Sequence, residues 1–315
     1  MNDEYAIGVD LGGTTVKAGL VSASGSIKYQ TKYPSKAEQG RNDVLKQIET
    51  AIKDVTRNSE GATIRGIGIG SPGVVDDNGI VKAPPNFLDF DHVPLKAHIE
   101  SLFNFPAKVE NDANVAGIAE SKFGAGKKFK DFLFVIWGTG VGGGIILNNE
   151  IYRGPTGGAG EIGHICVDFK GPQCNCGAVG CVEAFVGQKY LSHRTAERLK
   201  AHPDSRILAL VGGNPDKIEP VYISQAAKSG DLLAHEMLLE AGMILGVALG
   251  AVMNTMDLRV SIIGGGISAA GDFVMDAIKR SVQKHVLKPL RPDIRVLPAK
   301  LGNDAGILGA AGLVL

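Results

Sequence analysis

Several features are scarce in this sequence, and each scarcity excludes a class of protein. Only four of the 315 residues are cysteine, and three of these cluster at 174, 176 and 181, so a disulfide-stapled secreted domain is not expected. Basic and acidic residues balance at 33 each, which argues against a nucleic-acid surface or a strongly charged partner.

Export and membrane signals are also scarce. The first five residues, Met1 to Tyr5, carry acidic side chains where a signal peptide would carry basic ones. The most apolar segment, Ala241 to Met253, is interrupted by three glycines and is too short to span a bilayer. We therefore expect a cytoplasmic protein with no membrane partner and no nucleic-acid partner. In that setting clustered cysteines indicate a metal site rather than disulfides.

Glycine, by contrast, is abundant. The 43 glycines occur in blocks, and such blocks mark positions where the backbone turns sharply or approaches a ligand closely. The length suggests about two domains, and an apolar share of 44% is ordinary for a globular chain.

Residue periodicity predicts an α/β protein with two related halves. A hairpin of strands over 6–10 and 15–21 precedes a helix over 44–55, capped by Asn42 or Asp43. A buried strand over 64–69, an extended segment over 108–110 and a helix from Asn111 or Asp112 to Phe123 follow. Strands over 132–137, 144–147 and 259–263 then repeat the pattern. We expect two domains flanking a cleft: 1–112 with 303–315 as a small α/β domain, and 113–302 as a large one.

The cysteine cluster predicts a zinc site within residues 161–183. Cys174, Cys176 and Cys181 follow His164, and structural zinc favours a closed tetrahedral set of nitrogen and sulfur ligands. The fourth ligand stays open between His164 and Cys166, because His164, Cys166 and Asp168 alternate on one face of a strand.

Three strand ends share one design: an apolar strand, a glycine-rich turn and a nearby hydroxyl. Bare backbone amides and small hydroxyls suit phosphate oxygens. Asp10, at the end of its strand, can hold Mg²⁺ directly or through water. The three turns therefore predict a nucleotide site. They are Asp10-Leu11-Gly12-Gly13-Thr14-Thr15, Gly138-Thr139-Gly140-Val141-Gly142-Gly143-Gly144 and Gly264-Gly265-Gly266-Ile267-Ser268.

Two other glycine patterns imitate a dinucleotide fingerprint. Residues 68–73 and 138–143 both match G-x-G-x-x-G, but that motif needs a helix directly after the turn. The first runs into Pro72 and the second into an expected strand, so we expect no Rossmann site. The sequence contains no Walker pattern either.

Asp112 lies where an extended segment gives way to an alanine-rich helix. Aspartate at a helix start is commonly an N-cap, and the helix dipole favours its charged form. A charged carboxylate facing a cleft is also what a general base for a hydroxyl needs. Asn111 beside it can donate and accept hydrogen bonds with a polyol.

Five motifs, in this order, are similar to those of the ROK family (repressors, open reading frames, kinases), most closely its bacterial glucokinases. The resemblance covers essentially the whole chain, and the combination of E-x-G-H with C-x-C-G-x-x-G-C-x-E is highly specific. The motifs are Asp10–Thr14, Glu110–Asn114, Gly138–Gly144, Glu161–His164 and Cys174–Glu183.

The resemblance implies an actin-like, ribonuclease-H-type fold and ATP-dependent phosphorylation of a hexose at its 6-hydroxyl, glucose to glucose 6-phosphate before others, as in glycolysis. It implies that Asp112 is the base and that His164 completes the zinc site with Cys174, Cys176 and Cys181. The implied sugar contacts are Asn86, Asn111, Asp112, Glu161, His164 and Glu183. The implied contacts to ATP and Mg²⁺ are Asp10, Gly12, Gly13, Thr14, Thr15, Lys17, Gly138, Thr139, Gly140, Gly265 and Gly266. We also expect a homodimer or homotetramer.

Three alternatives stay open. An N-acetylmannosamine or N-acetylglucosamine kinase would carry the same motifs, polyphosphate can replace ATP in relatives, and a sugar-sensing binding protein would retain the site with vestigial catalysis. A repressor is not expected, because ROK repressors carry a helix-turn-helix ahead of the strand that ends at Asp10. Two departures from the family pattern bear on the site: Thr15 stands where many members have the lysine that appears here as Lys17, and Phe90 stands where tryptophan is common.

Overall fold

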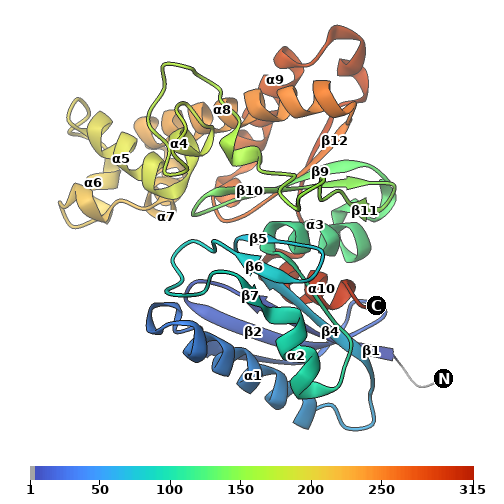
Figure 1. Cartoon of the computed structure of the whole chain (residues 1–315). Helices are drawn as coiled ribbons and strands as arrows, with labels where there is room; N and C mark the ends of the chain where they lie inside the picture. The colour runs from blue at the N-terminus through green and yellow to red at the C-terminus, as the bar shows by residue number, and fades with distance from the viewer. Residues whose placement is uncertain (1–3) are drawn as a thin grey trace. The chain divides into compact units, whose positions relative to one another are not determined.

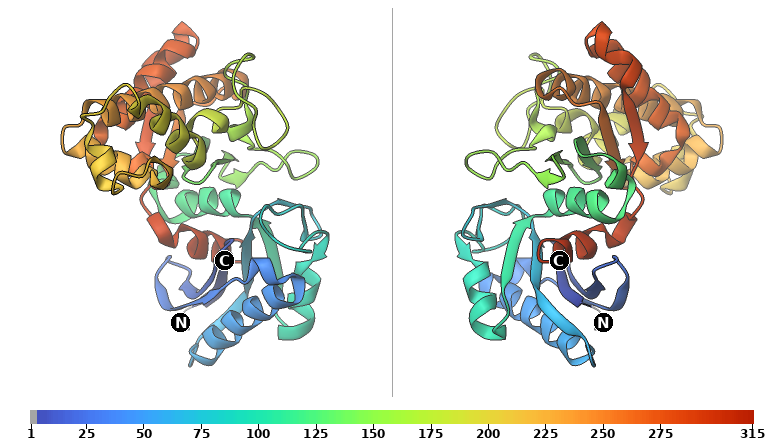
Figure 2. Two further views of the ribbon diagram at one scale, coloured as in Figure 1. Left: turned by 90° about the vertical axis from the view of Figure 1, so that its left-hand side faces the viewer. Right: turned by 90° about the vertical axis from the view of Figure 1, so that its right-hand side faces the viewer.

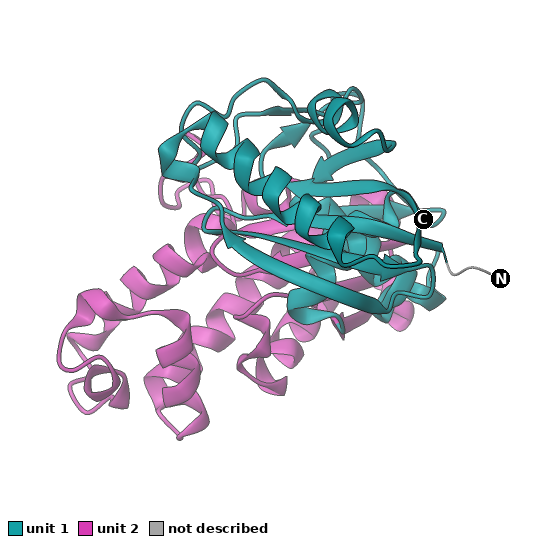
Figure 3. Ribbon diagram, turned by 90° about the horizontal axis from the view of Figure 1, so that it is seen from below, with its two compact units in different colours: residues 1–130, 144–160, 300–315 teal, residues 131–143, 161–299 magenta. Residues whose placement is uncertain are grey.

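A computed structural model describes residues 4–315. The argument against a signal peptide rests partly on Met1, Asn2 and Asp3, which lie outside the described residues. The chain divides into two compact units, coloured separately in Figure 3. The first runs to Lys130 and adds Gly144–Gly160 and Lys300–Leu315, and the second comprises Asp131–Gly143 and Glu161–Ala299. The domain boundaries expected after residues 112 and 302 stay a prediction.

The first unit is built on a five-stranded sheet whose order is β3-β2-β1-β4-β8. The predicted hairpin is confirmed: β1 and β2 are antiparallel, and Asp10 lies opposite Lys17. β4 runs parallel to β1, and β8 runs parallel to β4. The strands are β1 (Glu4–Leu11), β2 (Thr15–Ser22), β3 (Ile27–Pro34), β4 (Thr63–Ser71) and β8 (Ala107–Asn111).

Helices cover the two faces of this sheet in different ways, because alternate residues of a strand face opposite sides. α1 (Arg41–Arg57) and α2 (Leu95–Phe103) share one buried apolar core with Ile67 and Ile69 of β4. The intervening Gly68 faces the C-terminal helix α10 (Ala305–Gly312), which packs on β1, β4 and α3 (Asp112–Phe123). Figure 1 shows α1 and α2 along one face, and Figure 2 shows α10 beside the first strands.

Two local expectations for this unit have different outcomes. The helix predicted to begin at Asn111 or Asp112 and end at Phe123 is confirmed as α3. The cap predicted for α1 is wrong: the helix begins at Arg41, after Gly40 (φ 99°), and no side chain caps it. The glycine backbone conformation lets the chain enter the helix before Asn42 and Asp43 are reached.

A small three-stranded sheet, β5 (Val74–Val75), β6 (Ile80–Lys82) and β7 (Val93–Pro94), follows β4. The loop between β6 and β7 carries four non-glycine residues in the left-handed region, Ala83, Asn86, Asp89 and His92. Such conformations cost free energy and persist only where surrounding contacts impose them. Arg41 supplies two of those contacts by donating to the carbonyl oxygens of Asp89 (3.0 Å) and Asp91 (2.6 Å).

The second five-stranded sheet has the order β11-β10-β9-β12-β13. Numbered within its own half of the chain, this is the same order as in the first sheet, and β12 is parallel to both β9 and β13. The repetition confirms the predicted related halves. The strands are β9 (Phe132–Trp137), β10 (Val141–Leu147), β11 (Glu150–Ile151), β12 (Val260–Gly264) and β13 (Arg295–Pro298).

Helix α8 (Leu232–Met256) forms the helical core of the second unit with α9 (Asp272–His285). Its 25 residues are long and apolar enough to span a membrane, so the expectation of too short a segment is wrong. Its glycines are not breaks. A Cβ at Gly246 would lie 2.7 Å from the Ile278 carbonyl oxygen, so this glycine lets α8 approach α9 closely. The burial of α8 is that of a core helix.

Shorter helices complete the structure. The α-helices are α4 (Glu183–Val186), α5 (Gln188–Leu199), α6 (Arg206–Leu210) and α7 (Pro220–Lys228). The 3-10 helices are η1 (Ala37–Gln39), η2 (Ala125–Lys128), η3 (Ile162–His164), η4 (Pro215–Lys217), η5 (Ser268–Ala270), η6 (Lys288–Asp293) and η7 (Gly302–Asp304).

Candidate active site

The first glycine turn joins β1 to β2 and brings together two of the predicted nucleotide-binding residues. Lys17 Nζ lies 3.2 Å from Asp10 Oδ2, because the two residues pair across the hairpin. Lys17 thus reaches the strand-end carboxylate from two positions beyond Thr15, where many ROK members have their lysine. The start of α10 also lies against Asp10, since a Cβ at Gly306 would be 2.4 Å from Asp10 Cγ.

The turn itself, Gly12 to Thr15, is held by backbone and by a buried serine. Gly12 N–H donates to the Thr15 carbonyl at 2.8 Å. Ser35, which is fully buried, donates its hydroxyl to the Gly13 carbonyl at 2.7 Å and its N–H to the Thr14 carbonyl at 3.0 Å. With these carbonyls engaged, the turn has a defined shape. Ser35 was not among the predicted site residues.

Asn111 and Asp112 begin α3, and their roles differ from the sequence expectation. Asn111 is the N-cap: its Oδ1 accepts the N–H groups of Ala113 (2.9 Å) and Asn114 (3.1 Å). Its Nδ2 donates to the Gly73 carbonyl at 3.0 Å. The amide oxygen is therefore occupied by the helix, and one N–H remains for a ligand.

Asp112 is the first residue of the helix and is half-buried. Its Oδ1 accepts the Ala113 N–H at 2.8 Å. The position at the N-terminus of a 12-residue helix favours the ionised carboxylate. Asp112 therefore has the local setting that a general base needs.

The predicted sugar contact Asn86 is exposed. It lies in the loop between β6 and β7 and has a left-handed backbone conformation. Phe90, at the position where tryptophan is common, is only 1% exposed and belongs to the core beneath α1 and α2. It packs 5.6 Å from the ring of Phe87. Phe90 therefore anchors this loop rather than offering its ring to a ligand.

The second glycine turn joins β9 to β10 and is tied to Glu183. Glu183 Oε2 accepts the Val141 N–H at 2.9 Å, and a Cβ at Gly140 would lie 2.4 Å from the same oxygen. The carbonyls of Gly138 and Thr139 both accept the Gln188 N–H at 3.1 Å. This turn thus positions Glu183, a residue predicted to contact the sugar. It leads into a strand, as expected for a decoy of the dinucleotide motif.

The third glycine turn follows β12. Gly265 has φ +93°, and a Cβ there would lie 2.1 Å from the Trp137 carbonyl oxygen, so only glycine fits. Ser268 donates its hydroxyl to the Gly265 carbonyl at 2.8 Å. Gly266 is exposed, with open space around its missing side chain. A phosphate can approach the backbone at Gly266.

Four side chains of the predicted metal site converge in the second unit. Ligand atoms of His164, Cys174, Cys176 and Cys181 all lie within 4.8 Å of one another. His164 directs Nδ1 towards Cys174 Sγ (3.8 Å) and Nε2 towards the Glu161 carboxylate (4.0 Å). Three thiols and one imidazole match a closed zinc site. A carboxylate beside the second ring nitrogen is common around metal-bound histidine.

The local backbone separates His164 from Cys166. Ile162–His164 form a turn of 3-10 helix rather than a strand, so the expected alternation of His164, Cys166 and Asp168 along one strand face is wrong. Cys166 is exposed, and its backbone pairs with that of Cys181 in an isolated β-bridge. Its thiol lies outside the converging group. The arrangement favours His164 as the fourth ligand.

The thiols differ in acidity when no cation neutralises them. Burial raises the pKa of Cys174 and raises the pKa of Cys181 to about 12. The Ala178 backbone N–H lowers the pKa of Cys176. A divalent ion would have to displace protons from the buried thiols on binding.

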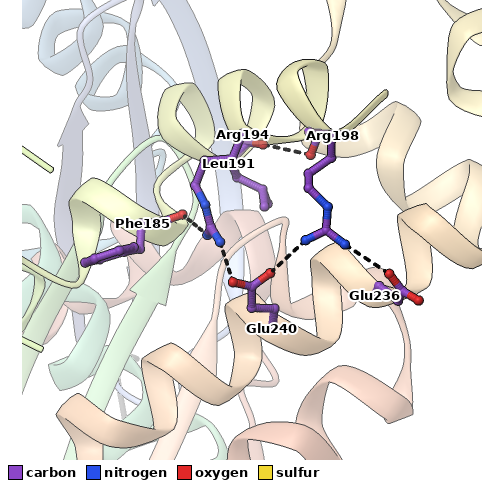
Figure 4. A network of polar contacts seen from close by, with 7 residues as sticks. Phe185, Leu191, Arg194, Arg198, Glu236 and Glu240 are labelled. Carbon is purple, nitrogen blue, oxygen red and sulfur yellow. Dashed lines mark hydrogen bonds and ion pairs between the residues drawn. The ribbon is translucent and has the colours of Figure 1, made fainter. Parts of the chain in front are cut away.

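An ion-pair network braces the helices that follow this cluster (Figure 4). Arg194 of α5 donates to the Phe185 carbonyl of α4 at 3.1 Å and pairs with Glu240 of α8. Arg198 pairs with Glu236 at 3.2 Å and with Glu240 at 3.8 Å. Because α4 begins at Glu183, the network fixes the helical turn that presents this carboxylate.

The structure thus brings some predicted residues together within each unit. Asp10 meets Lys17, Asn111 adjoins Asp112, the four predicted metal ligands converge, and Glu183 meets the second glycine turn. Sequence reasoning missed Ser35 and Gln188, whose hydrogen bonds to the turns leave no spacing signal.

Comparison with known proteins agrees with this arrangement. A glucokinase of Thermotoga maritima is 35% identical over 312 residues, which cover 98% of this chain and 96% of the relative. The crystal structure of a ROK family glucokinase from Streptomyces griseus in complex with glucose and AMPPNP superposes with a TM-score of 0.85 at 37% identity, covering 98% of this chain and 99% of that one. The predicted actin-like fold is confirmed.

Transcription factors share the same framework. The xylose repressor of Bacillus subtilis is 30% identical over 318 residues, which cover 99% of this chain but 77% of the repressor. The ROK family itself matches residues 6–315. With its two related sheets, its three glycine turns and its cysteine–histidine cluster, this chain belongs to the ROK family.

Proposed function

We propose that this chain is a hexokinase-type kinase that transfers the γ-phosphoryl group of ATP to the 6-hydroxyl of glucose. The observation that carries the proposal is Asp112 at the first position of α3, in a chain 37% identical to a glucokinase solved with glucose and an ATP analogue. The product is glucose 6-phosphate, the form in which glucose enters glycolysis.

Asp112 is the proposed general base. Its carboxylate accepts the Ala113 N–H and lies at a helix N-terminus, where the helix dipole favours the charged form that can take the proton of the attacking hydroxyl. The remaining N–H of Asn111 can orient a sugar hydroxyl. Asn86, Glu161, His164 and Glu183 are the other proposed sugar contacts.

The glycine turns are the proposed nucleotide contacts. The first turn, Gly12, Gly13, Thr14 and Thr15, would bind phosphate oxygens through threonine hydroxyls and through its backbone N–H groups other than that of Gly12, which the Thr15 carbonyl accepts. Asp10 would hold Mg²⁺, with Lys17 beside it for the phosphates. When bound, Mg²⁺ neutralises charge that develops on the β- and γ-phosphates. Gly138, Thr139, Gly140, Gly265 and Gly266 complete the proposed set.

Zn²⁺ is the proposed occupant of the cysteine–histidine cluster. Its ligands would be His164, Cys174, Cys176 and Cys181, whose ligand atoms already converge within 4.8 Å. A closed tetrahedral site supplies folding free energy and no open position for chemistry. Its role would be to hold Glu161 and Glu183, which flank the cluster, for sugar binding.

The test is sugar-dependent ADP release from MgATP across glucose, mannose, fructose, N-acetylmannosamine and N-acetylglucosamine. We expect turnover on glucose, and a fall of about 10²–10⁴ in kcat for Asp112→Asn with sugar binding retained. Asp43→Asn is the matched control, because Asp43 also lies in the first turn of a helix of the first unit. Its kcat should equal that of the wild type.

Other outcomes separate the alternatives. Preference for an N-acetylated sugar would reassign the substrate but keep the base. Near-wild-type turnover in Asp112→Asn would refute the base assignment. Binding of glucose and ATP without product from either ATP or polyphosphate would point to a sugar-sensing protein.

A further inference from the structure

A buried ion pair lies directly beside the proposed base. Glu110, the residue of β8 before Asn111, is only 2% exposed. Its Oε2 accepts from Arg153 Nε, and Oε1 accepts the Asn111 N–H at 2.9 Å and Asn114 Nδ2 at 3.0 Å. Both carboxylate oxygens are therefore engaged, and the charge is neutralised by a guanidinium.

These bonds define the first turn of α3. Glu110 accepts hydrogen bonds from Asn111 and Asn114, which lie before and after Asp112 in the chain. Asn111 in turn caps the helix through two N–H groups. One carboxylate thus holds the start of α3 at two points, the backbone N–H of Asn111 and the side-chain amide of Asn114. A shift of Glu110 would therefore disturb the turn that carries Asp112.

Arg153 reaches Glu110 from a distant part of the first unit. It follows β11, and the chain on either side is anchored: Tyr152 N–H donates to the Ile145 carbonyl at 2.8 Å, and the Arg153 carbonyl accepts the Ala159 N–H at 3.0 Å. Arg153 keeps 42% of its side chain exposed while Glu110 is enclosed. The backbone of Arg153 is therefore fixed by its own strand pair and loop, and β11 also packs on α3.

We propose that Arg153 is a positioning residue for Asp112 and acts through Glu110. The inference rests on the proposed function, in which Asp112 is the base. A buried carboxylate without its partner is strongly destabilised and will move, take up a proton or admit water. The turn carrying Asp112 would then lose the alignment that proton transfer requires, and small misplacements in an active site lower rates steeply.

The experiment measures kcat and KM for glucose and ATP in a set of variants. Arg153→Met should lower kcat about 10–100-fold with both KM values little changed. Arg153→Lys should recover part of kcat, because an ammonium group still neutralises Glu110. The pair Glu110→Gln with Arg153→Met should recover most of it, since the buried charge is gone and the amide oxygen can still accept.

The decisive comparison uses the Asp112→Asn background. If Arg153 acts through Asp112, adding Arg153→Met there should change kcat less than about twofold, because residues that work as a unit are not additive. An equal loss in both backgrounds would overturn the inference. So would a loss confined to KM, or a double variant at residues 110 and 153 that stays as slow as Arg153→Met.

Controls separate this proposal from instability and from the proposed function. Arg65→Met removes another arginine of the first unit that pairs with a glutamate, Glu4, at the surface, and should leave kcat unchanged. Should Arg153→Met be too unstable to assay, Arg153→Lys and the double variant answer the same question. Failure of the base assignment itself is read from Asp112→Asn alone, which would keep full turnover.

Discussion

At the scale of single residues, one carboxylate of the first unit has an unusual set of partners. Asp54 of α1 accepts hydrogen bonds from Tyr29 (3.2 Å), Thr31 (2.7 Å) and Tyr33 (2.8 Å) on the edge strand β3. The bond from Thr31, followed by that from Tyr33, lowers the pKa of Asp54 below its usual value. Asp54 thus ties an edge strand to the helix that covers it.

The lowered pKa makes a prediction about stability and pH. A carboxylate with a lower pKa in the folded state stabilises the protein above its unfolded pKa, and this contribution is lost as the pH falls towards the folded pKa. We expect Asp54→Asn to cost about 1 kcal/mol in the free energy of unfolding at pH 7. The cost should shrink below about pH 4. Urea unfolding of both proteins at several pH values checks this, and a cost that does not vary with pH would contradict it.

Prediction from sequence succeeded or failed at single residues for physical reasons. The C-x-C-x4-C spacing was enough to predict that three thiols converge, because clustered cysteines are typical of a metal site. The fourth ligand was ambiguous, since the choice of His164 depends on a 3-10 turn that no spacing reveals. Glu110 and Arg153 meet across 43 positions of sequence, and no local pattern encodes that pairing.

At the scale of elements, helices and strands were predictable where apolar periodicity is strong. α3 begins where expected because the capping residue Asn111 precedes it, and it ends where expected because Gly124 follows Phe123. α1 began earlier than expected, since its N-terminus depends on the conformation of Gly40 rather than on a capping side chain. The length of the apolar helix α8 was underestimated because glycine weakens a helix in solution. In this structure the glycines instead allow α8 to contact α9 closely.

The segment 161–183 leads to a testable prediction at the scale of elements. It contains little regular structure. Two isolated backbone β-bridges, which are not disulfides, brace it: one pairs Cys166 with Cys181 and the other pairs Gln173 with Val179. A bound metal would therefore supply much of its order. We expect removal of metal by a chelator to lower the melting temperature and raise the KM for glucose, with recovery on adding Zn²⁺.

Paired cysteine variants make that test specific. Cys176→Ser should lose bound zinc, measured as metal per chain, because Cys176 is one of the four converging ligands. Cys166→Ser is the matched control and should keep one zinc, since Cys166 lies outside the group. Fully active wild-type protein without zinc, or zinc loss in Cys166→Ser, would refute the assignment.

At the scale of the whole molecule, the two five-stranded sheets have the same strand order. This repetition could be anticipated from the recurring order of strands and glycine turns. The chain path of the first unit could be anticipated only in part: the return of residues 303–315 was expected, whereas Gly144–Gly160, expected in the large domain, also belongs to the first unit. Cytoplasmic location and a homodimeric or homotetrameric state stay predictions.

The return of the C-terminal helix depends on glycine. A Cβ at Gly68 would lie 1.7 Å from the Ala310 carbonyl oxygen, and one at Gly8 would lie 2.0 Å from that of Ile307. Backbone atoms cannot yield as a side chain can, so we expect Gly68→Ala to cost more than about 2 kcal/mol. Gly158→Ala, where the nearest atom is 4.0 Å away, is the matched control. Equal urea midpoints for the two variants would contradict this account.

The position of α10 also has a consequence for how the protein is made. Strands β1 and β4 leave the ribosome before the second unit, yet the helix that covers their glycine face is synthesised after it. The first unit must therefore wait, with one face uncovered, while the whole second unit is translated and free to fold. The order of synthesis and the order of completion are reversed for these two units, and the first unit is most exposed to aggregation until α10 is added.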